Sequence, residues 1–241
     1  SALRVLYVQE DVADRTLAML KGAMAELSVG NPDRLSTDVG PVITEEAQRG
    51  ILDHVEAMRR KGRAVHAAPL PEACRHGTFV APTLIEIGGM AELEREVFGP
   101  VLHVLRFRRD RLDALLDEVN ATGYALTFGV HSRIDETIAR ATERSAAGNA
   151  YVNRNLIGAV VGSQPFGGHG LSGTGPKAGG PLYLRRLLSS RPPEPDLPRA
   201  PAPPPPAAVA WRDWLRARGH TEAAERCARH AERSRLGLCL D

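Results

Sequence analysis

Apolar runs typical of β-strands alternate with amphipathic helical patterns along the first two thirds of this chain. We predict strands over residues 3–9, 64–67, 78–87, 101–107, 126–131 and 150–155. We predict helices over residues 11–27, 44–61, 90–100, 111–119 and 135–147. Strands that alternate with helices, and that read as apolar runs, are typical of an α/β fold with a largely parallel sheet.

The composition changes sharply after residue 191. Residues 192–208 are rich in proline, which predicts a semi-rigid spacer without a core of its own. Residues 211–236 return to a helical pattern, which Gly219 should interrupt, with seven arginines against four acidic residues. We interpret this segment as a solvated amphipathic helix in preference to a nucleic-acid patch.

Composition excludes several classes of protein. The formal net charge is only +2, so we expect no nucleic-acid contact from this chain. The sequence contains no run of eighteen apolar residues, which argues against a membrane span. Three widely separated cysteines fit a reducing compartment better than a disulfide scaffold, so we expect a cytoplasmic location.

A glycine-rich stretch at residues 165–180 holds seven glycines in sixteen positions and spells G-x-G-x-x-G from Gly168 to Gly173. The dinucleotide fingerprint needs a strand directly before these glycines and a helix directly after them. Proline at position 176 and glycines at 179 and 180 argue against such a helix. We therefore interpret the stretch as an irregular loop that passes close to another part of the protein.

Several motifs together resemble those of the aldehyde dehydrogenase family. They are EVFGPV at residues 96–101, PFGG at 165–168 and GNPDRLSTDVGPVI at 30–43. The longer string GSQPFGGHGLSGTGPKAGGPLYL at 162–184 resembles the group of this family that oxidises glutamate-γ-semialdehyde. The resemblance extends from residue 1 to about residue 190. His169 departs from the glutamate typical of close relatives, which changes the local charge of the loop.

This resemblance implies the C-terminal part of an aldehyde dehydrogenase fold. Residues 1–150 would belong to the catalytic α/β subdomain, and residues 151–190 to an aldehyde-anchor loop and an oligomerisation flap. A Pro-rich linker at 191–210 and the helical start of a C-terminal extension at 211–241 would follow. A flap beginning at residues 176–183, where a β-hairpin pairs with a neighbouring subunit, implies a homo-oligomer.

The resemblance also implies a chemistry in which a thiolate attacks an aldehyde and a nicotinamide accepts hydride. The nucleophilic cysteine would lie immediately before Ser1, so we expect the chain alone to be inactive. The cofactor that the resemblance implies is NAD. The Glu96 carboxylate would accept hydrogen bonds from the nicotinamide ribose, and Phe98 would pack beside the nicotinamide. FAD would belong only to an upstream proline-oxidising domain of the bifunctional members.

Glutamate-γ-semialdehyde carries an α-carboxylate at the end opposite its aldehyde. Successive backbone N–H groups in a rigid loop bind such an anion well. By resemblance, Gly158 and Ala159 supply these backbone donors, Ser1 a hydroxyl donor and Phe166 an aromatic wall. The alternative is that Gly158 is a turn glycine after the strand at 150–155, with no role in substrate binding.

Cys74 is a tempting substitute nucleophile, because His76 lies two residues away in a polar loop. We expect it to be structural, since the family's nucleophile belongs elsewhere and a metal would need more ligands. The alternative to an enzyme is an aldehyde-dehydrogenase-like module without chemistry that serves oligomerisation or covers a tunnel. A third hypothesis keeps the enzyme but assigns it another aldehyde.

Overall fold

The computed structural model describes residues 2–157, 163–190 and 206–234. They divide into two compact units. The first contains residues 2–157 together with 169–172, and the second contains the remaining described residues. Each unit is described by itself below.

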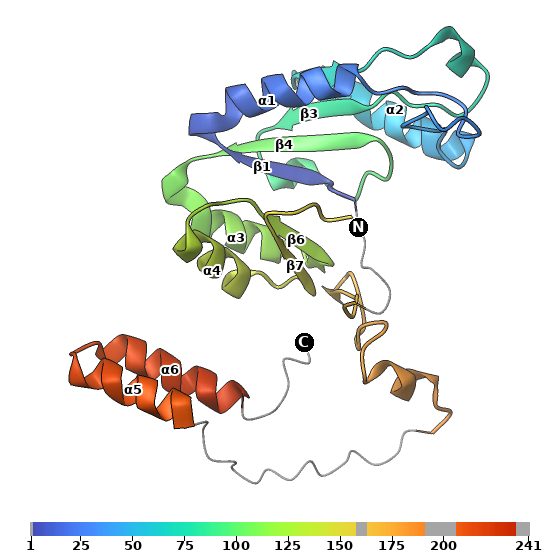
Figure 1. The fold of residues 1–241 in the computed structure, drawn as a ribbon. Coiled ribbons are helices and arrows are strands. Elements are labelled where there is room, and N and C mark those ends of the chain that lie inside the picture. Colours follow the sequence, from blue (N-terminus) through green and yellow to red (C-terminus); the bar gives the residue numbers. More distant parts are fainter. Residues whose placement is uncertain (1, 158–162, 191–205, 235–241) are drawn as a thin grey trace. The chain divides into compact units, whose positions relative to one another are not determined.

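A four-stranded sheet forms the centre of the first unit, in the order β1-β4-β3-β2 (Figure 1). The strands are β1 (Val5–Gln9), β2 (Val65–Ala67), β3 (Thr83–Ile87) and β4 (Val101–Phe107). Strand β4 pairs in parallel with both β1 and β3, whereas β2 runs antiparallel to β3 at one edge. The predicted α/β fold with a largely parallel sheet is therefore confirmed, with β2 as the exception.

Two helices, α1 (Glu10–Ala25) and α2 (Glu45–Arg60), cover the two faces of this sheet. Alternate residues of β4 divide between them. Val101 and Leu105 pack with the apolar stripe of α2, while Val104 packs with that of α1. The predicted start of α2 is confirmed, because the Thr44 hydroxyl accepts a hydrogen bond from the Ala47 backbone N–H at 3.1 Å.

The rest of the first unit is built from shorter elements. They are α3 (Leu112–Ala121), β5 (Tyr124–Ala125), β6 (Thr127–Val130), α4 (Asp135–Arg144), β7 (Asn149–Val152) and β8 (His169–Gly170). Strands β6 and β7 pair in parallel, and β5 pairs antiparallel with β8. Three 3₁₀ helices lie at Glu72–Arg75, Met90–Glu92 and Arg109–Arg111.

One predicted strand is shorter than its apolar run. The run over residues 78–87 forms a strand only at β3, which begins at Thr83. Pro82 has no backbone N–H, so it cannot donate to the ladder that β3 makes with its neighbours. The apolar residues before it enter the core without strand pairing, as the buried Val80 shows.

The second unit includes a helical hairpin formed by α5 (Pro206–Ala217) and α6 (Thr221–Ser234). The predicted break at Gly219 is confirmed: this residue has φ +77°, and the His220 N–H reaches back to the Leu215 carbonyl at 3.0 Å. The predicted linker boundary is wrong, because α5 begins inside it at Pro206. Proline fits the first turn of a helix, where its missing N–H is not needed.

Among the described residues, 176–183, where the oligomerisation flap is expected to begin, form no strand in this single chain, and the expected pairing with a neighbouring subunit stays a prediction. Phe166 and Ala178 form an isolated antiparallel bridge, and Tyr183–Leu187 form a 3₁₀ helix instead of a strand. None of the helices described is long and apolar enough to cross a membrane.

Candidate active site

The residues expected to bind a cofactor lie in the connection that leads into β4. The predicted helix over residues 90–100 is wrong: only Met90–Glu92 form a 3₁₀ turn, and the chain from Leu93 to Pro100 is irregular. Leu93 and Val97 both pack against the core under α2. Their spacing of four residues is helix-like, but it arises here from a loop that touches the core twice.

Arg4 brings the two predicted cofactor residues together. Its Nε donates a hydrogen bond to Glu96 Oε1 at 2.8 Å, and its Cζ lies 4.2 Å from the centroid of the Phe98 ring. The Phe98 ring is largely exposed, at 72%. A carboxylate and an open aromatic face thus lie side by side at the start of β4, joined by one guanidinium.

Sequence reasoning missed Arg4, because arginine is common in this chain and the contacts that give Arg4 a role are not local. Its contact with Glu96 spans 92 residues of sequence. The contact exists because β1 pairs in parallel with β4, with Val5 opposite His103. That register places the residue before β1 beside the loop before β4.

Gly99 allows the loop to lie directly on the core. A Cβ added at this position would come within 2.4 Å of Ile51 Cδ1, and Ile51 is buried in the cluster under α2. The Gly99 carbonyl also accepts a hydrogen bond from Arg4 at 3.3 Å. The glycine of the EVFGPV motif therefore has a steric reason, and its carbonyl forms part of the Arg4 environment.

A pair of histidines lies behind Arg4. His103 is 2% exposed, its Nδ1 lies 3.3 Å from the Arg4 carbonyl oxygen, and its Nε2 lies 2.8 Å from His54 Nε2. Because a carbonyl only accepts, His103 carries its proton on Nδ1, and its Nε2 accepts the proton of His54. Burial lowers the pKa of His103 to about 4, which keeps this ring neutral near neutral pH.

The predicted substrate-binding residues are less completely placed. Ser1, Gly158 and Ala159 lie outside the described residues, so their proposed contacts stay predictions. Phe166 is half-buried in the second unit, where its backbone N–H and carbonyl both bond to Ala178 at 2.9 Å. The structure therefore brings together Glu96 and Phe98, but it does not place Phe166 relative to them.

The glycine-rich stretch forms a tight loop, in agreement with the sequence interpretation. A Cβ added at Gly173 would lie 2.2 Å from the Gly168 carbonyl oxygen, and one at Gly170 would lie 2.6 Å from that of Gly123. The residues that follow contain turns and a short 3₁₀ helix, with no long helix among those described. Glycine is needed here because backbone meets backbone.

Cys74 is a buried structural residue. Its side chain is 6% exposed, and its thiol S–H donates a hydrogen bond to the Val29 carbonyl oxygen, with Sγ 3.6 Å from that oxygen. A substrate aldehyde has no access to a thiol in this position, which confirms the structural interpretation. Across the described ranges, no group of three or more His, Cys, Asp or Glu side chains is arranged to hold a metal ion.

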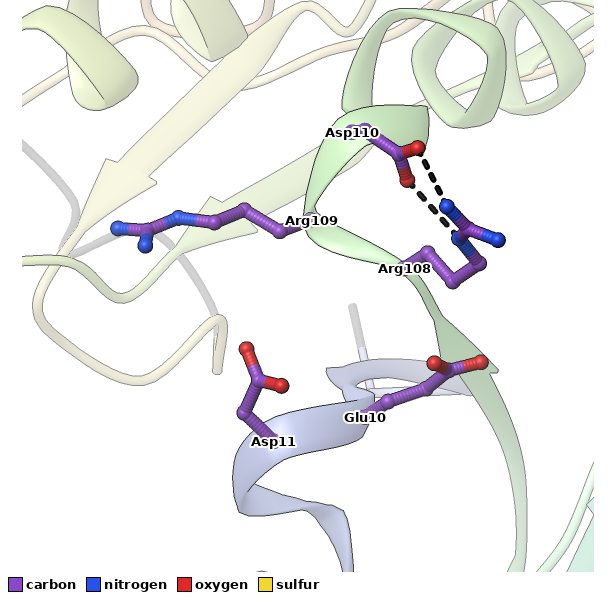
Figure 2. Close-up of a pocket in the computed structure, with 5 residues that line it drawn as sticks. All are labelled: Glu10, Asp11, Arg108, Arg109 and Asp110. Atoms are coloured by element: carbon purple, nitrogen blue, oxygen red, sulfur yellow. Dashed lines mark hydrogen bonds and ion pairs between the residues drawn. The ribbon is translucent and has the colours of Figure 1, made fainter.

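A charged hollow of about 460 Å³ lies at the opposite ends of β1 and β4 (Figure 2). Glu10 and Asp11 line it from the start of α1, and Arg108–Asp110 line it from the end of β4. Asp110 accepts two hydrogen bonds from Arg108, at 2.7 and 3.1 Å, which lower the pKa of this carboxyl. This hollow is open, and all five residues that line it are charged. It therefore offers no apolar side chain against which a nicotinamide or an aldehyde could pack, and it lies far along the strands from Glu96.

Comparisons with known proteins bear on this site. The Aldehyde dehydrogenase family matches residues 1–191. The bifunctional protein PutA of Klebsiella aerogenes is 64% identical over 197 residues, which cover 80% of this chain and 15% of that protein. A 1-pyrroline-5-carboxylate dehydrogenase of Geobacillus kaustophilus is 37% identical over 186 residues, which cover 76% of this chain and 35% of that protein.

A crystal structure of a proline utilization A mutant from Bradyrhizobium japonicum resembles the chain with a TM-score of 0.72 and 54% sequence identity. That match covers 76% of this chain and 18% of the other. The chain thus spans less than a fifth of the length of these two PutA proteins and about a third of the Geobacillus dehydrogenase.

Proposed function

The chain belongs to the aldehyde dehydrogenase family, and on that premise we propose that it forms part of an NAD-dependent enzyme that oxidises glutamate-γ-semialdehyde to glutamate. The names of its relatives, PutA and 1-pyrroline-5-carboxylate dehydrogenase, support this substrate. In this proposal the chain is the C-terminal part of the dehydrogenase half of a bifunctional enzyme of proline catabolism. The proline-oxidising half, with its FAD, lies in another part of that enzyme.

The single observation that carries the proposal is the grouping of Glu96 and Phe98 at the start of β4. Of the two carboxylate oxygens of Glu96, Oε1 accepts a hydrogen bond from Arg4, and Oε2 accepts none from the residues that the structure describes. A carboxylate has about four acceptor positions, so the second oxygen remains available to ribose hydroxyls. The open Phe98 ring offers a flat apolar face of the kind that a nicotinamide packs against.

When bound, the nicotinamide nucleotide supplies the acceptor for the aldehyde hydride. Glu96 would accept hydrogen bonds from its ribose hydroxyls, and Phe98 would pack beside its nicotinamide ring. The proposed chemistry also needs a cysteine thiolate, which would add to the aldehyde carbon and, after hydride transfer, be displaced by water as the acid is released. Cys74 has no part in this step, because its thiol is buried.

The substrate's α-carboxylate is proposed to bind to the backbone N–H groups of Gly158 and Ala159, with the Ser1 hydroxyl as a further donor and Phe166 as an aromatic wall. The residues that lead into this loop have a defined position. Leu156 contacts Gly129 of β6 so closely that a Cβ on Gly129 would lie 2.5 Å from Leu156 Cδ2. This contact holds Leu156, two residues before Gly158, against β6.

We also propose that the enzyme is a homo-oligomer in which residues 182–188 contribute to the interface between subunits. Apolar side chains in this segment are exposed at high density: Leu182, Tyr183, Leu184, Leu187 and Leu188. Burial of such side chains against a second subunit would be favourable, at about 25 cal/mol per Å² of apolar surface.

Steady-state kinetics of the full-length enzyme test the proposed activity. We expect NADH formation from glutamate-γ-semialdehyde with a kcat/KM at least about tenfold above that for succinate semialdehyde. Glu96→Gln should raise KM for NAD about tenfold or more, because a charged acceptor is replaced by a neutral amide. Glu94→Gln is the matched control, since Glu94 is exposed in the same loop and has no assigned contact with Arg4.

Two results would contradict the proposal. A purified, folded full-length protein that forms no NADH with either aldehyde would favour the non-catalytic module. A preference for succinate semialdehyde would retain the enzyme but reject the substrate.

A further inference from the structure

We propose that Arg4 is a positioning residue of the nucleotide site, which orients Glu96 through one carboxylate oxygen and holds the Phe98 ring from its face. This inference rests on the proposed function, because it assigns Arg4 a role only if Glu96 and Phe98 bind the nucleotide. It adds a residue to the site residues that were identified from the sequence.

The contacts of the Arg4 side chain reach three consecutive parts of one loop. Nε donates to Glu96 at 2.8 Å, a terminal nitrogen donates to the Gly99 carbonyl at 3.3 Å, and Cζ lies over the Phe98 ring, 4.2 Å from its centroid. The loop from residue 93 to residue 100 has no regular backbone hydrogen bonding of its own that would hold these side chains. One guanidinium therefore sets the relative positions of the carboxylate and the aromatic ring.

The backbone of Arg4 is held as firmly as its side chain. Its carbonyl oxygen accepts a hydrogen bond from the His103 backbone N–H at 3.1 Å and is approached by the ring Nδ1 of the same residue at 3.3 Å. His103 in turn contacts His54 on α2. Arg4 is thus anchored to β4 and, through the histidine pair, to α2, which makes it a rigid support for an irregular loop.

The geometry favours arginine over lysine at this position. A guanidinium donates to a carboxylate and a carbonyl at the same time and still presents a flat face to an aromatic ring. A lysine ammonium is a single point of charge and cannot make all three contacts in one orientation. Only one Glu96 oxygen is engaged, so Arg4 can hold this carboxylate while the ribose is bound.

The test is the dissociation constant of NADH, measured by fluorescence titration of the full-length enzyme. We expect Arg4→Gln to raise this constant about tenfold and to change KM for the aldehyde by less than about twofold. Arg4→Lys should recover part of the loss and bind NADH about threefold more weakly than the unmodified enzyme. The split between nucleotide and aldehyde affinity is a readout that a general loss of structure would not produce.

Arg63→Gln is the matched control. Arg63 Nε binds Glu92 Oε2 at 2.7 Å, in an ion pair of the same kind close to the same loop, and it touches neither Glu96 nor Phe98. Its loss should leave NADH binding unchanged. If Arg63→Gln weakens binding as much as Arg4→Gln does, the effect is unspecific and the inference fails.

A double-variant cycle with Glu96→Gln separates the inference from the proposed function. If Arg4 acts through Glu96, its replacement in the Glu96→Gln background should raise the NADH dissociation constant by less than about threefold. Weaker binding in Glu96→Gln together with unchanged binding in both Arg4 variants overturns the inference alone. An enzyme that binds no NADH, or a Glu96→Gln variant that binds it normally, overturns the proposed function instead. Should Arg4→Gln not fold, normal NADH binding by Arg4→Lys would still refute the role of Arg4.

Discussion

The histidine pair behind Arg4 predicts a local loss of stability at mildly acidic pH. His103 donates from Nδ1 to the Arg4 carbonyl and accepts at Nε2 from His54, so a second proton on His103 would remove the acceptor that His54 needs. Burial is the main reason that the pKa of His103 falls from 6.5 to about 4, and the neighbouring His54 lowers it further. A charged His103 is therefore incompatible with the His54 contact, whereas its Nδ1–H can still donate to the Arg4 carbonyl.

The sign and size follow from proton linkage. In the unfolded segment His103 becomes protonated below about pH 6.5, whereas in the folded segment it stays neutral down to about pH 4. The contribution of His103 to folding stability is therefore fully present above about pH 6.5 and is lost as the pH falls toward about 4. Between about pH 7.5 and about pH 5 the loss amounts to at most about 2 kcal/mol. His54 is only half-buried, and solvent near it should reduce the loss to about 1 kcal/mol.

Amide hydrogen exchange of the full-length enzyme measures this loss locally and does not require two-state unfolding of a large protein. After correction for intrinsic exchange, protection of β1 and β4 should fall by about five- to thirtyfold between these pH values. His103→Asn removes one titrating ring, so its protection should be lower at neutral pH and should fall less steeply through the window, where only His54, whose pKa burial also lowers, still contributes.

His66→Asn provides the control, because His66 lies on β2 of the same sheet and takes no part in the pair. It should retain the pH dependence of the unmodified enzyme. The reasoning is refuted if protection of β1 and β4 does not change with pH, or if His103→Asn shows the same slope as the unmodified enzyme.

Three further predictions address other parts of the chain. Gly129→Ala places a Cβ 2.5 Å from Leu156 Cδ2, so Leu156 must shift. We expect KM for the aldehyde to rise at least about threefold while the NADH dissociation constant stays unchanged, and an equal change in both constants would count against an anchor loop after Leu156. Cys74→Ser should retain kcat within about threefold, because the thiol is buried against the Val29 carbonyl. Loss of turnover in a folded variant would instead indicate that Cys74 is the nucleophile. Gly22→Ala adds a Cβ to α1 with no atom within 4 Å, so hydrogen exchange should show α1 stabilised by about 0.5–1 kcal/mol; a destabilised helix would show that this side of α1 is covered in the full-length enzyme.

Much of the fold could be predicted because its signals are local. The apolar run of β4 predicts a buried strand, and the apolar spacing in α1 predicts a buried face on which Leu17, Leu20 and Met24 do pack, whereas Val12 of the same expected face is exposed. Local signals also explain the errors. Leu93 and Val97 have helical spacing in a segment that is not a helix, and Pro206 reads as linker although proline is compatible with a first helical turn.

The candidate site was predictable only in part, for a different reason. Glu96 and Phe98 lie within one short motif, which a family resemblance can identify. Arg4 contacts them only because β1 pairs with β4 across about a hundred residues of intervening chain, and strand pairing of this kind leaves no local trace in the sequence. The histidine pair depends on the same pairing and on the position of α2, so it too appears only in three dimensions.

The most direct test of the proposed function is a crystal structure of the full-length enzyme with NAD and the product glutamate. The proposal predicts Glu96 within hydrogen-bond distance of the nicotinamide ribose, and the glutamate α-carboxylate on the backbone N–H groups of Gly158 and Ala159. A nucleotide bound away from Glu96, or an α-carboxylate held in another pocket, would contradict it.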